Sequence, residues 1–271
     1  MPTVEAPLNY IGAMRDRPVF HAIQPAKTNL VLESHTVRIT DARGLAEQPS
    51  LDREGFALVD HKSQVSNFRD QDELETRYLA EVADLIKTLS GATETRPSPG
   101  PLARYTRRED AARSAGTAPA ARFVHTDYTD ISARDYFLPQ LMDPDEALRR
   151  YSRITVYQTW RALSGSPQDV PLTVADGRSV RLEDMVTADT VLGEDYARNQ
   201  AFEFSVCRHN PDHRWCYYSN MRPDEVLVFK GYDFNPNSPA RLFHTAFDDP
   251  SAPPDAPPRA SVEARVFAFF D

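Results

Sequence analysis

A histidine and an aspartate stand two residues apart at His125 and Asp127, in a run that also holds the strand-favouring Phe123, Val124 and Tyr128. In a β-strand, residues i and i+2 point to the same face, so this imidazole and this carboxylate can reach one metal ion. A third ligand would complete the two-histidine, one-carboxylate triad of non-haem Fe(II) oxygenases, which leaves coordination positions open. Alone, the pair indicates little, because surface and capping residues produce the same pattern.

The candidate for the third ligand is His244. It lies inside an apolar stretch that contains Phe243 and Ala246, whereas His209 and His213 flank a turn. A histidine within an apolar strand is more often a satisfied core residue than a ligand. The position of His244 therefore leaves both interpretations open until the residues that follow it are considered.

An arginine and a serine, Arg259 and Ser261, open the last predicted strand, beginning 15 residues after His244. They share strand parity, so guanidinium and hydroxyl face one side and together suit a single carboxylate. In an oxygenase that uses 2-oxoglutarate, this pair would hold the distal carboxylate of the cosubstrate. Arg265 has the same parity and is the alternative anchor, and pairing of Arg259 with a nearby aspartate is the alternative without a ligand.

The second half of the chain is rich in short, regularly spaced strand-like runs separated by turn residues, which favours a sandwich or jelly roll. A short helix is predicted over residues 143–151, and earlier strands over 29–39 and 55–59. The later strands are expected at residues 123–128, 153–161, 170–176, 201–208, 214–219, 225–231, 241–247 and 261–270.

The longest predicted helix spans residues 71–90, where apolar residues recur at steps of three and four and form one stripe. Asp70 is the expected N-cap, Glu73 occupies the capping-box position, and Gly91 can end the helix. Such a helix should lie against a sheet.

The composition is continuous and shows no repeat, so we predict a single domain over residues 1–271. Residues 1–121 would contribute N-terminal strands and the long helix packed on the core, and residues 122–271 the jelly-roll core with the metal site. The first 28 residues are interrupted by prolines and are expected to be irregular.

Composition also limits the function. Hydrophobic residues make up 41% of the chain and the net charge is -9, which predicts a globular protein that binds neither nucleic acid nor an anionic membrane. No apolar run approaches the roughly 20 residues of a membrane helix, and the start lacks the features of a signal peptide. The only cysteines, Cys207 and Cys216, could pair, but a reducing cytoplasm fits better. The sequence says nothing about oligomeric state.

The run of residues 122–129, Arg-Phe-Val-His-Thr-Asp-Tyr-Thr, resembles the iron-site motif of a family of bacterial and fungal secondary-metabolism oxygenases. That family includes the hydroxylase component of cephamycin 7-methoxylation, the aspergillic-acid hydroxylase/desaturase and a gibberellin desaturase. The resemblance covers roughly residues 50–270. The other similar segments are residues 55–59, 159–163, 171–176 with 178–180, 213–219 with 221 and 224–225, 244–247 and 257–265.

The resemblance implies a mainly β, double-stranded β-helix (jelly-roll) fold with flanking helices, and an enzyme that uses Fe(II), 2-oxoglutarate and O2. It implies His125, Asp127 and His244 as metal ligands and Arg259 as the 2-oxoglutarate anchor. The reaction would attack an unactivated C–H bond of a small molecule by hydroxylation, desaturation or ring closure. At residues 159–163 the chain departs from the family pattern, which has Asn before the tryptophan and Pro after the arginine.

Further candidates follow from neighbouring positions. Tyr157 is a candidate for the cosubstrate site, and Tyr128, Trp160 and Arg161 are candidates for contacting the substrate, with aromatic core packing as the alternative for the rings. Two other functions remain open. The same ligands could hold Zn(II) in a hydrolase, or the histidine and aspartate could merely form hydrogen bonds in a non-catalytic small-molecule-binding jelly roll.

Overall fold

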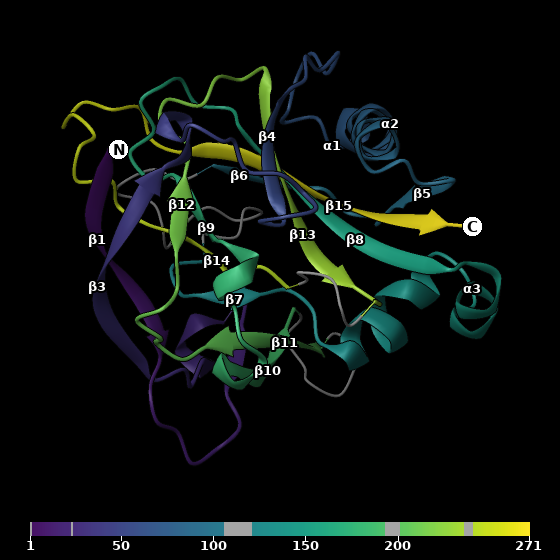
Figure 1. The fold of residues 1–271 in the computed structure, drawn as a ribbon, viewed down its shortest axis with the longest axis horizontal. Helices are drawn as coiled ribbons and strands as arrows, with labels where there is room; N and C mark the ends of the chain where they lie inside the picture. Colours follow the sequence, from purple (N-terminus) through teal and green to yellow (C-terminus); the bar gives the residue numbers. More distant parts are fainter. Residues whose placement is uncertain (1, 23, 106–120, 193–200, 236–240) are drawn as a thin grey trace.

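Two β-sheets form the fold of this computed structural model, which describes residues 2–22, 24–105, 121–192, 201–235 and 241–271 (Figure 1). Within these ranges the larger sheet runs in the order β1 (Thr3–Ile11), β3 (Leu32–Asp41), β12 (Trp215–Tyr217), β9 (Leu172–Ala175), β14 (His244–Ala246), β7 (His125–Thr126), β11 (Ala201–Cys207), β10 (Met185–Val191), β2 (Val19–His21). The second runs β4 (Phe56–Asp60), β13 (Glu225–Asp233), β8 (Arg153–Ala162), β15 (Ala260–Phe270), β5 (Glu94–Pro97), with β6 (Leu102–Tyr105) also paired to β15.

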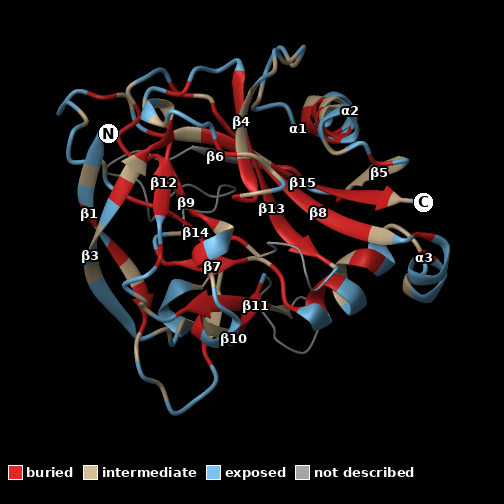
Figure 2. Ribbon diagram, viewed as in Figure 1, coloured by how far each residue is buried: buried red, intermediate tan, exposed pale blue. Residues whose placement is uncertain are grey.

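This is the predicted mainly β jelly roll with flanking helices. Strands from residues 1–121 enter both sheets: β1, β2 and β3 join the larger one, and β4, β5 and β6 the smaller one. Buried residues concentrate along the strands, where the two sheets face each other (Figure 2). The N-terminal part of the chain is therefore built into the same β-structure as the later strands.

The long helix forms where its apolar stripe predicts, as α1 (Gln71–Glu73), a π-helical turn over Leu74–Tyr78, and α2 (Leu79–Ser90). Asp70 caps it by accepting hydrogen bonds from the backbone amides of Asp72 and Glu73, and Gly91 ends it with a left-handed φ of 70°. The capping-box prediction for Glu73 is wrong, because its carboxylate accepts hydrogen bonds from Ser66 and Asn67 instead.

Strand β15 separates a helix-facing side from a polar side. The buried stripe of the helix, which includes Val82 and Ile86, packs in one cluster with Val262, Ala264 and Val266 of β15. Because side chains alternate along a strand, the intervening Ser261, Glu263 and Arg265 point to the opposite face, toward the larger sheet. The helix thus covers the outer face of the smaller sheet, and the polar residues lie on its inner face (Figure 1).

The prediction of an irregular leader over residues 1–28 is wrong. Strand β1 pairs with β3 along its whole length, from Thr3 opposite Thr40 to Ile11 opposite Leu32. Its alternate residues Ala6, Leu8 and Tyr10 are buried in the core. The prolines of the leader obscured this alternation. Among the described residues, no helix is long and apolar enough to cross a membrane.

Candidate metal centre

Two neighbouring strands of the larger sheet bring the two histidines together. His244 of β14 is the direct cross-strand partner of His125 of β7, with ring centroids 4.3 Å apart. Asp127 stands one residue beyond β7, which is shorter than predicted, and its Oδ1 lies 3.5 Å from Nε2 of His125 and 3.8 Å from Nε2 of His244. One ligand atom from each of the three residues lies within 4.8 Å of the others.

Backbone carbonyls fix which nitrogen of each imidazole is available. Nδ1 of His125 lies 2.9 Å from the carbonyl oxygen of Phe123, and Nδ1 of His244 lies 3.3 Å from that of Leu242. A carbonyl can only accept, so each Nδ1 carries the proton and each Nε2 keeps its lone pair. In both rings the lone pair is on Nε2, the nitrogen nearest Asp127. A metal site between the three residues requires this tautomer of each histidine.

The second carboxylate oxygen of Asp127 is held by the protein. Its Oδ2 accepts hydrogen bonds from Nε2 of Gln158 at 2.7 Å, from Nε of Arg265 at 2.8 Å, and from Nη2 of the same guanidinium. This leaves Oδ1 as the oxygen directed at the imidazoles.

Electrostatics keep all three side chains in their ligand forms. Burial, together with the nearby imidazole of His244, lowers the pKa of His125 to about 4, and burial also lowers the pKa of His244. Burial would raise the pKa of Asp127, but the guanidinium of Arg265 and the imidazoles outweigh it and hold that pKa well below its ordinary value. At neutral pH the centre therefore offers two neutral imidazoles and one carboxylate, a donor set that fits Fe(II) with positions left open.

The predicted anchor lies in the interior beside this centre. Arg259 is 2% exposed, its guanidinium carbon lies 5.1 Å from the ring centroid of Trp160, and its Nε donates to Oγ of Ser261 at 3.4 Å. The same guanidinium donates to the carbonyl of Val170 at 3.4 Å and lies 3.7 Å from a carboxylate oxygen of Glu263.

A small cavity, of about 20 Å³, lies beside His244. Trp160, Glu263 and Arg265 also line it, and its remaining lining residues are Gln158, Thr159, Leu172, Phe229 and Ala264. Among the described residues, the buried indole Nε1 of Trp160 has no hydrogen-bond partner. The lining therefore combines apolar side chains with a few polar groups.

Two other sequence candidates, Tyr157 and Arg161, lie on the outer face of β8. Tyr157 belongs to the cluster that packs against the long helix, on the opposite face of β8 from Gln158 and Trp160. Arg161 shares that outer face, where it donates to the backbone carbonyl of His61 at 2.8 Å. Strand parity thus removes Tyr157 and Arg161 from the set around the metal centre.

Tyr128 is fully buried in an aromatic cluster, with ring centroids 4.8 Å from Phe137, 6.4 Å from Tyr232 and 6.5 Å from Phe267. Its hydroxyl has no hydrogen-bond partner in the part of the chain that the structure describes. This residue packs beside the centre as part of the core.

Gln158 and Glu263 were not singled out from the sequence. Gln158 shares parity with Trp160 on β8, and Glu263 shares parity with Arg259 and Arg265 on β15. This shared parity is the sequence signal that could indicate them. It identifies site residues only when it is known which face of β8 and of β15 points toward the metal centre.

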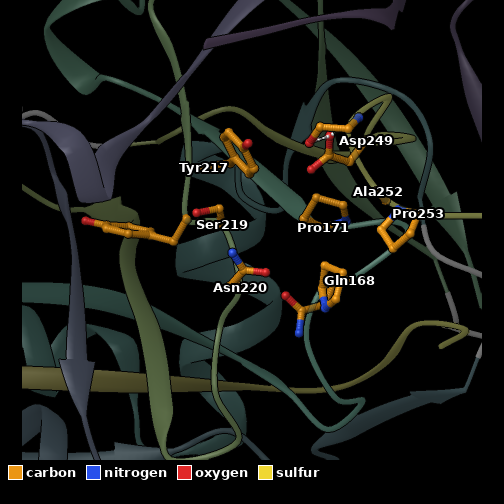
Figure 3. A pocket seen from close by; sticks show the side chains of 11 residues that line it. Gln168, Pro171, Tyr217, Ser219, Asn220, Asp249, Ala252 and Pro253 are labelled. Carbon is orange, nitrogen blue, oxygen red and sulfur yellow. Dashed lines mark hydrogen bonds between the residues drawn. The ribbon is translucent and has the colours of Figure 1, made fainter. Parts of the chain in front are cut away.

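A larger cavity, of about 210 Å³, lies apart from this chemistry (Figure 3). Gln168, Tyr217, Asn220 and Asp249 are among its lining residues, and none of the predicted site residues lines it.

The comparisons with known proteins agree with this geometry. The family described as "Oxidoreductase/YMDC permease-like domain" matches residues 8–269. The Fe(II)/2-oxoglutarate-dependent dioxygenase nvfI of Aspergillus novofumigatus is 31% identical over 240 residues, covering 87% of this chain and 83% of that protein. The hydroxylase/desaturase efuI of Hormonema carpetanum is 31% identical over 294 residues, covering 100% of this chain and 96% of that protein.

Solved structures of the iron and alpha-ketoglutarate-dependent endoperoxidase NvfI superpose with the same fold. One has a TM-score of 0.83 at 28% identity and covers 99% of this chain and 98% of its own. The match extends over nearly the whole of both chains. The chain belongs to the family of Fe(II)/2-oxoglutarate-dependent dioxygenases and hydroxylase/desaturases that these relatives represent.

Proposed function

We propose that this protein is a non-haem Fe(II)/2-oxoglutarate-dependent oxygenase that attacks an unactivated C–H bond of a small secondary-metabolism substrate. The observation that carries the proposal is the convergence of two Nε2 lone pairs and one carboxylate oxygen within 4.8 Å, from residues far apart in the sequence. The names of the relatives support it. They lend no support to the zinc hydrolase or the non-catalytic jelly roll.

In the proposed mechanism, His125 and His244 would hold Fe(II) through Nε2, and Asp127 would hold it through Oδ1. When bound, Fe(II) with 2-oxoglutarate and O2 would supply the oxidising chemistry, with succinate and CO2 as the products of the keto acid. The chain itself supplies orientation and shielding: its hydrogen bonds fix the three side chains, and the buried surroundings exclude water.

Arg259 is the proposed anchor for the distal carboxylate of 2-oxoglutarate, with the hydroxyl of Ser261 beside it. Its burial, its place over the indole of Trp160 and the hydroxyl of Ser261 beside it support this role, because a buried guanidinium next to a hydroxyl suits one carboxylate. The alternative, Arg265, already donates twice to Asp127. An arginine committed to a metal ligand is the weaker candidate for the cosubstrate.

The substrate is proposed to be a small molecule, and Trp160, which lines the small cavity beside His244, is the candidate for contacting it. Hydroxylation, desaturation and ring closure remain equally compatible with the site. We place the enzyme in the cytoplasm, since both Cys207 and Cys216 are buried free thiols.

The test is succinate formation from 2-oxoglutarate, screened with amino acids, peptides and polyketide-like acids as substrates. Turnover should require Fe(II) and should fall to background in His244→Ala, which removes one ligand. His35→Ala, a partly exposed histidine of β3, is the matched control and should retain wild-type turnover. Wild-type turnover in His244→Ala, or hydrolysis supported by Zn(II) alone, would contradict the proposal.

A further inference from the structure

The groups that hold the second oxygen of Asp127 come from two adjacent strands. Arg265 of β15 and Gln158 of β8 are direct cross-strand partners, and both donate to the same oxygen, Oδ2. The first oxygen, Oδ1, is the one nearest both imidazoles. Oδ2 is thus held by hydrogen bonds to the protein, whereas Oδ1 faces the two imidazoles.

A glycine on the next strand makes room for this arrangement. Gly231 lies where the pairing of β13 with β8 shifts register, between Lys230 and Tyr232. A Cβ placed on Gly231 would stand 2.7 Å from Oε1 of Gln158 and 3.0 Å from Cε2 of Tyr128. Real Cβ atoms do not approach other atoms this closely, so the amide of Gln158 occupies the space that a side chain at residue 231 would need.

The amide of Gln158 has little room to move away from a side chain at residue 231. Gln158 is 5% exposed, and within the described ranges its buried Oε1 has no hydrogen-bond partner. Its Nε2 donates to Asp127. A displaced Gln158 would lose this hydrogen bond.

We propose that Gln158 and Arg265 are positioning residues that restrict Asp127 to one metal-binding oxygen, and that Gly231 is required because it lets Gln158 reach the carboxylate. This inference rests on the proposed function. Its consequence would be a more open metal site: with one oxygen from Asp127 and one nitrogen from each histidine, more coordination positions would stay free than with Asp127 bound through both oxygens.

The role can be measured without turnover, as Mn(II) affinity of the metal-free full-length chain by calorimetry. Gln158→Met removes the donor and keeps length and net charge. Loss of a partner that orients a metal ligand costs about 10–100-fold in affinity, so Mn(II) binding should weaken at least about tenfold. Arg265→Lys keeps the charge but not the paired donors, and its Mn(II) affinity should lie between those of the wild type and Gln158→Met.

Gly231→Ala tests the same role from a different residue. It should weaken Mn(II) binding about as much as Gln158→Met, and in the Gln158→Met background it should add less than about twofold, since residues acting through one contact are not additive. Gly165→Ala is the matched control, because a Cβ there would meet nothing within 4 Å, and it should bind Mn(II) like the wild type.

Thermal melting of the metal-free variants separates positioning from simple packing. If Gln158→Met and Gly231→Ala melt at lower temperature but bind Mn(II) within twofold of the wild type, the residues are structural only and the inference is wrong. Additive losses in the double variant would also overturn it. A wild-type chain that binds no divalent metal would instead overturn the proposed function, so the two failures are distinguishable.

Discussion

At the scale of single residues, the chemistry depends on which atoms the protein leaves available. The Nδ1 atoms of His125 and His244 face backbone carbonyls, and Oδ2 of Asp127 faces Gln158 and Arg265. One donor atom on each ligand residue is left to face the others. The site is therefore preorganised by hydrogen bonds that the sequence motif does not contain.

Removing the proposed anchor should affect the cosubstrate and spare the metal. Arg259→Ala should raise the KM for 2-oxoglutarate about 10–100-fold, the loss expected for a buried charge-assisted hydrogen-bonded pair, with Mn(II) affinity near that of the wild type. Arg222→Ala, at a half-exposed surface arginine, is the control and should leave both unchanged. An unchanged KM in Arg259→Ala would mean that the anchor is another residue.

The histidine ligands should make the metal-free protein sensitive to acid. Burial lowers the pKa of His125 to about 4, whereas the unfolded chain titrates near ~6.5. Between these values the unfolded chain binds a proton that the native protein does not, so stability falls as the pH falls, on the order of 1 kcal/mol per pH unit for this group. Urea unfolding at pH 7, 6 and 5 measures the slope.

His125→Gln should show a shallower loss of stability over this range than the wild type. Equal slopes for the wild type and His125→Gln would show that this imidazole is not held neutral by its surroundings.

Some residues of the candidate site could be predicted from the sequence, and others could not. His125, Asp127, His244 and Arg259 could be chosen because each stands in a motif. Gln158 could not, because its role depends on the register of β8 against β15 and on a glycine in a third strand. Contacts of this kind are set by tertiary pairing and leave no local pattern.

At the scale of elements, the long helix is the part that local sequence predicts best. Its apolar stripe, its N-cap at Asp70 and its end at Gly91 all appear in the structure. Strand β7 was predicted over six residues and has two, and β14 has three. Short strands at the metal centre are defined by neighbouring strands, and propensity alone cannot give their ends.

The helix–sheet contact should respond to truncation on one face only. Ile86 is fully buried in the cluster with β15, so Ile86→Ala should cost about 2–5 kcal/mol of unfolding free energy. Leu89 lies on the same helix but is 38% exposed, so Leu89→Ala should cost clearly less. Urea denaturation compares the two, and equal losses would argue against the packing described for this helix.

At the scale of the whole molecule, the jelly roll gathers residues that are distant in sequence. Asp127 and Arg265 are 138 residues apart, yet they form an ion pair beside the metal centre. The strand spacing of the later chain predicted this fold class, but it did not predict that β1 and β2 would join the larger sheet. The prediction for the leader is wrong because it gives more weight to the prolines than to the alternation of the apolar residues Ala6, Leu8 and Tyr10.

The central claim is that one ion and one keto acid bind together at the three ligands. Anaerobic titration of the protein with Fe(II) and 2-oxoglutarate tests it most directly. The account predicts a weak visible metal-to-ligand charge-transfer band that requires both components, is absent when Zn(II) replaces Fe(II), and is lost in His244→Ala. No band in the wild type, or an undiminished band in His244→Ala, would contradict the account.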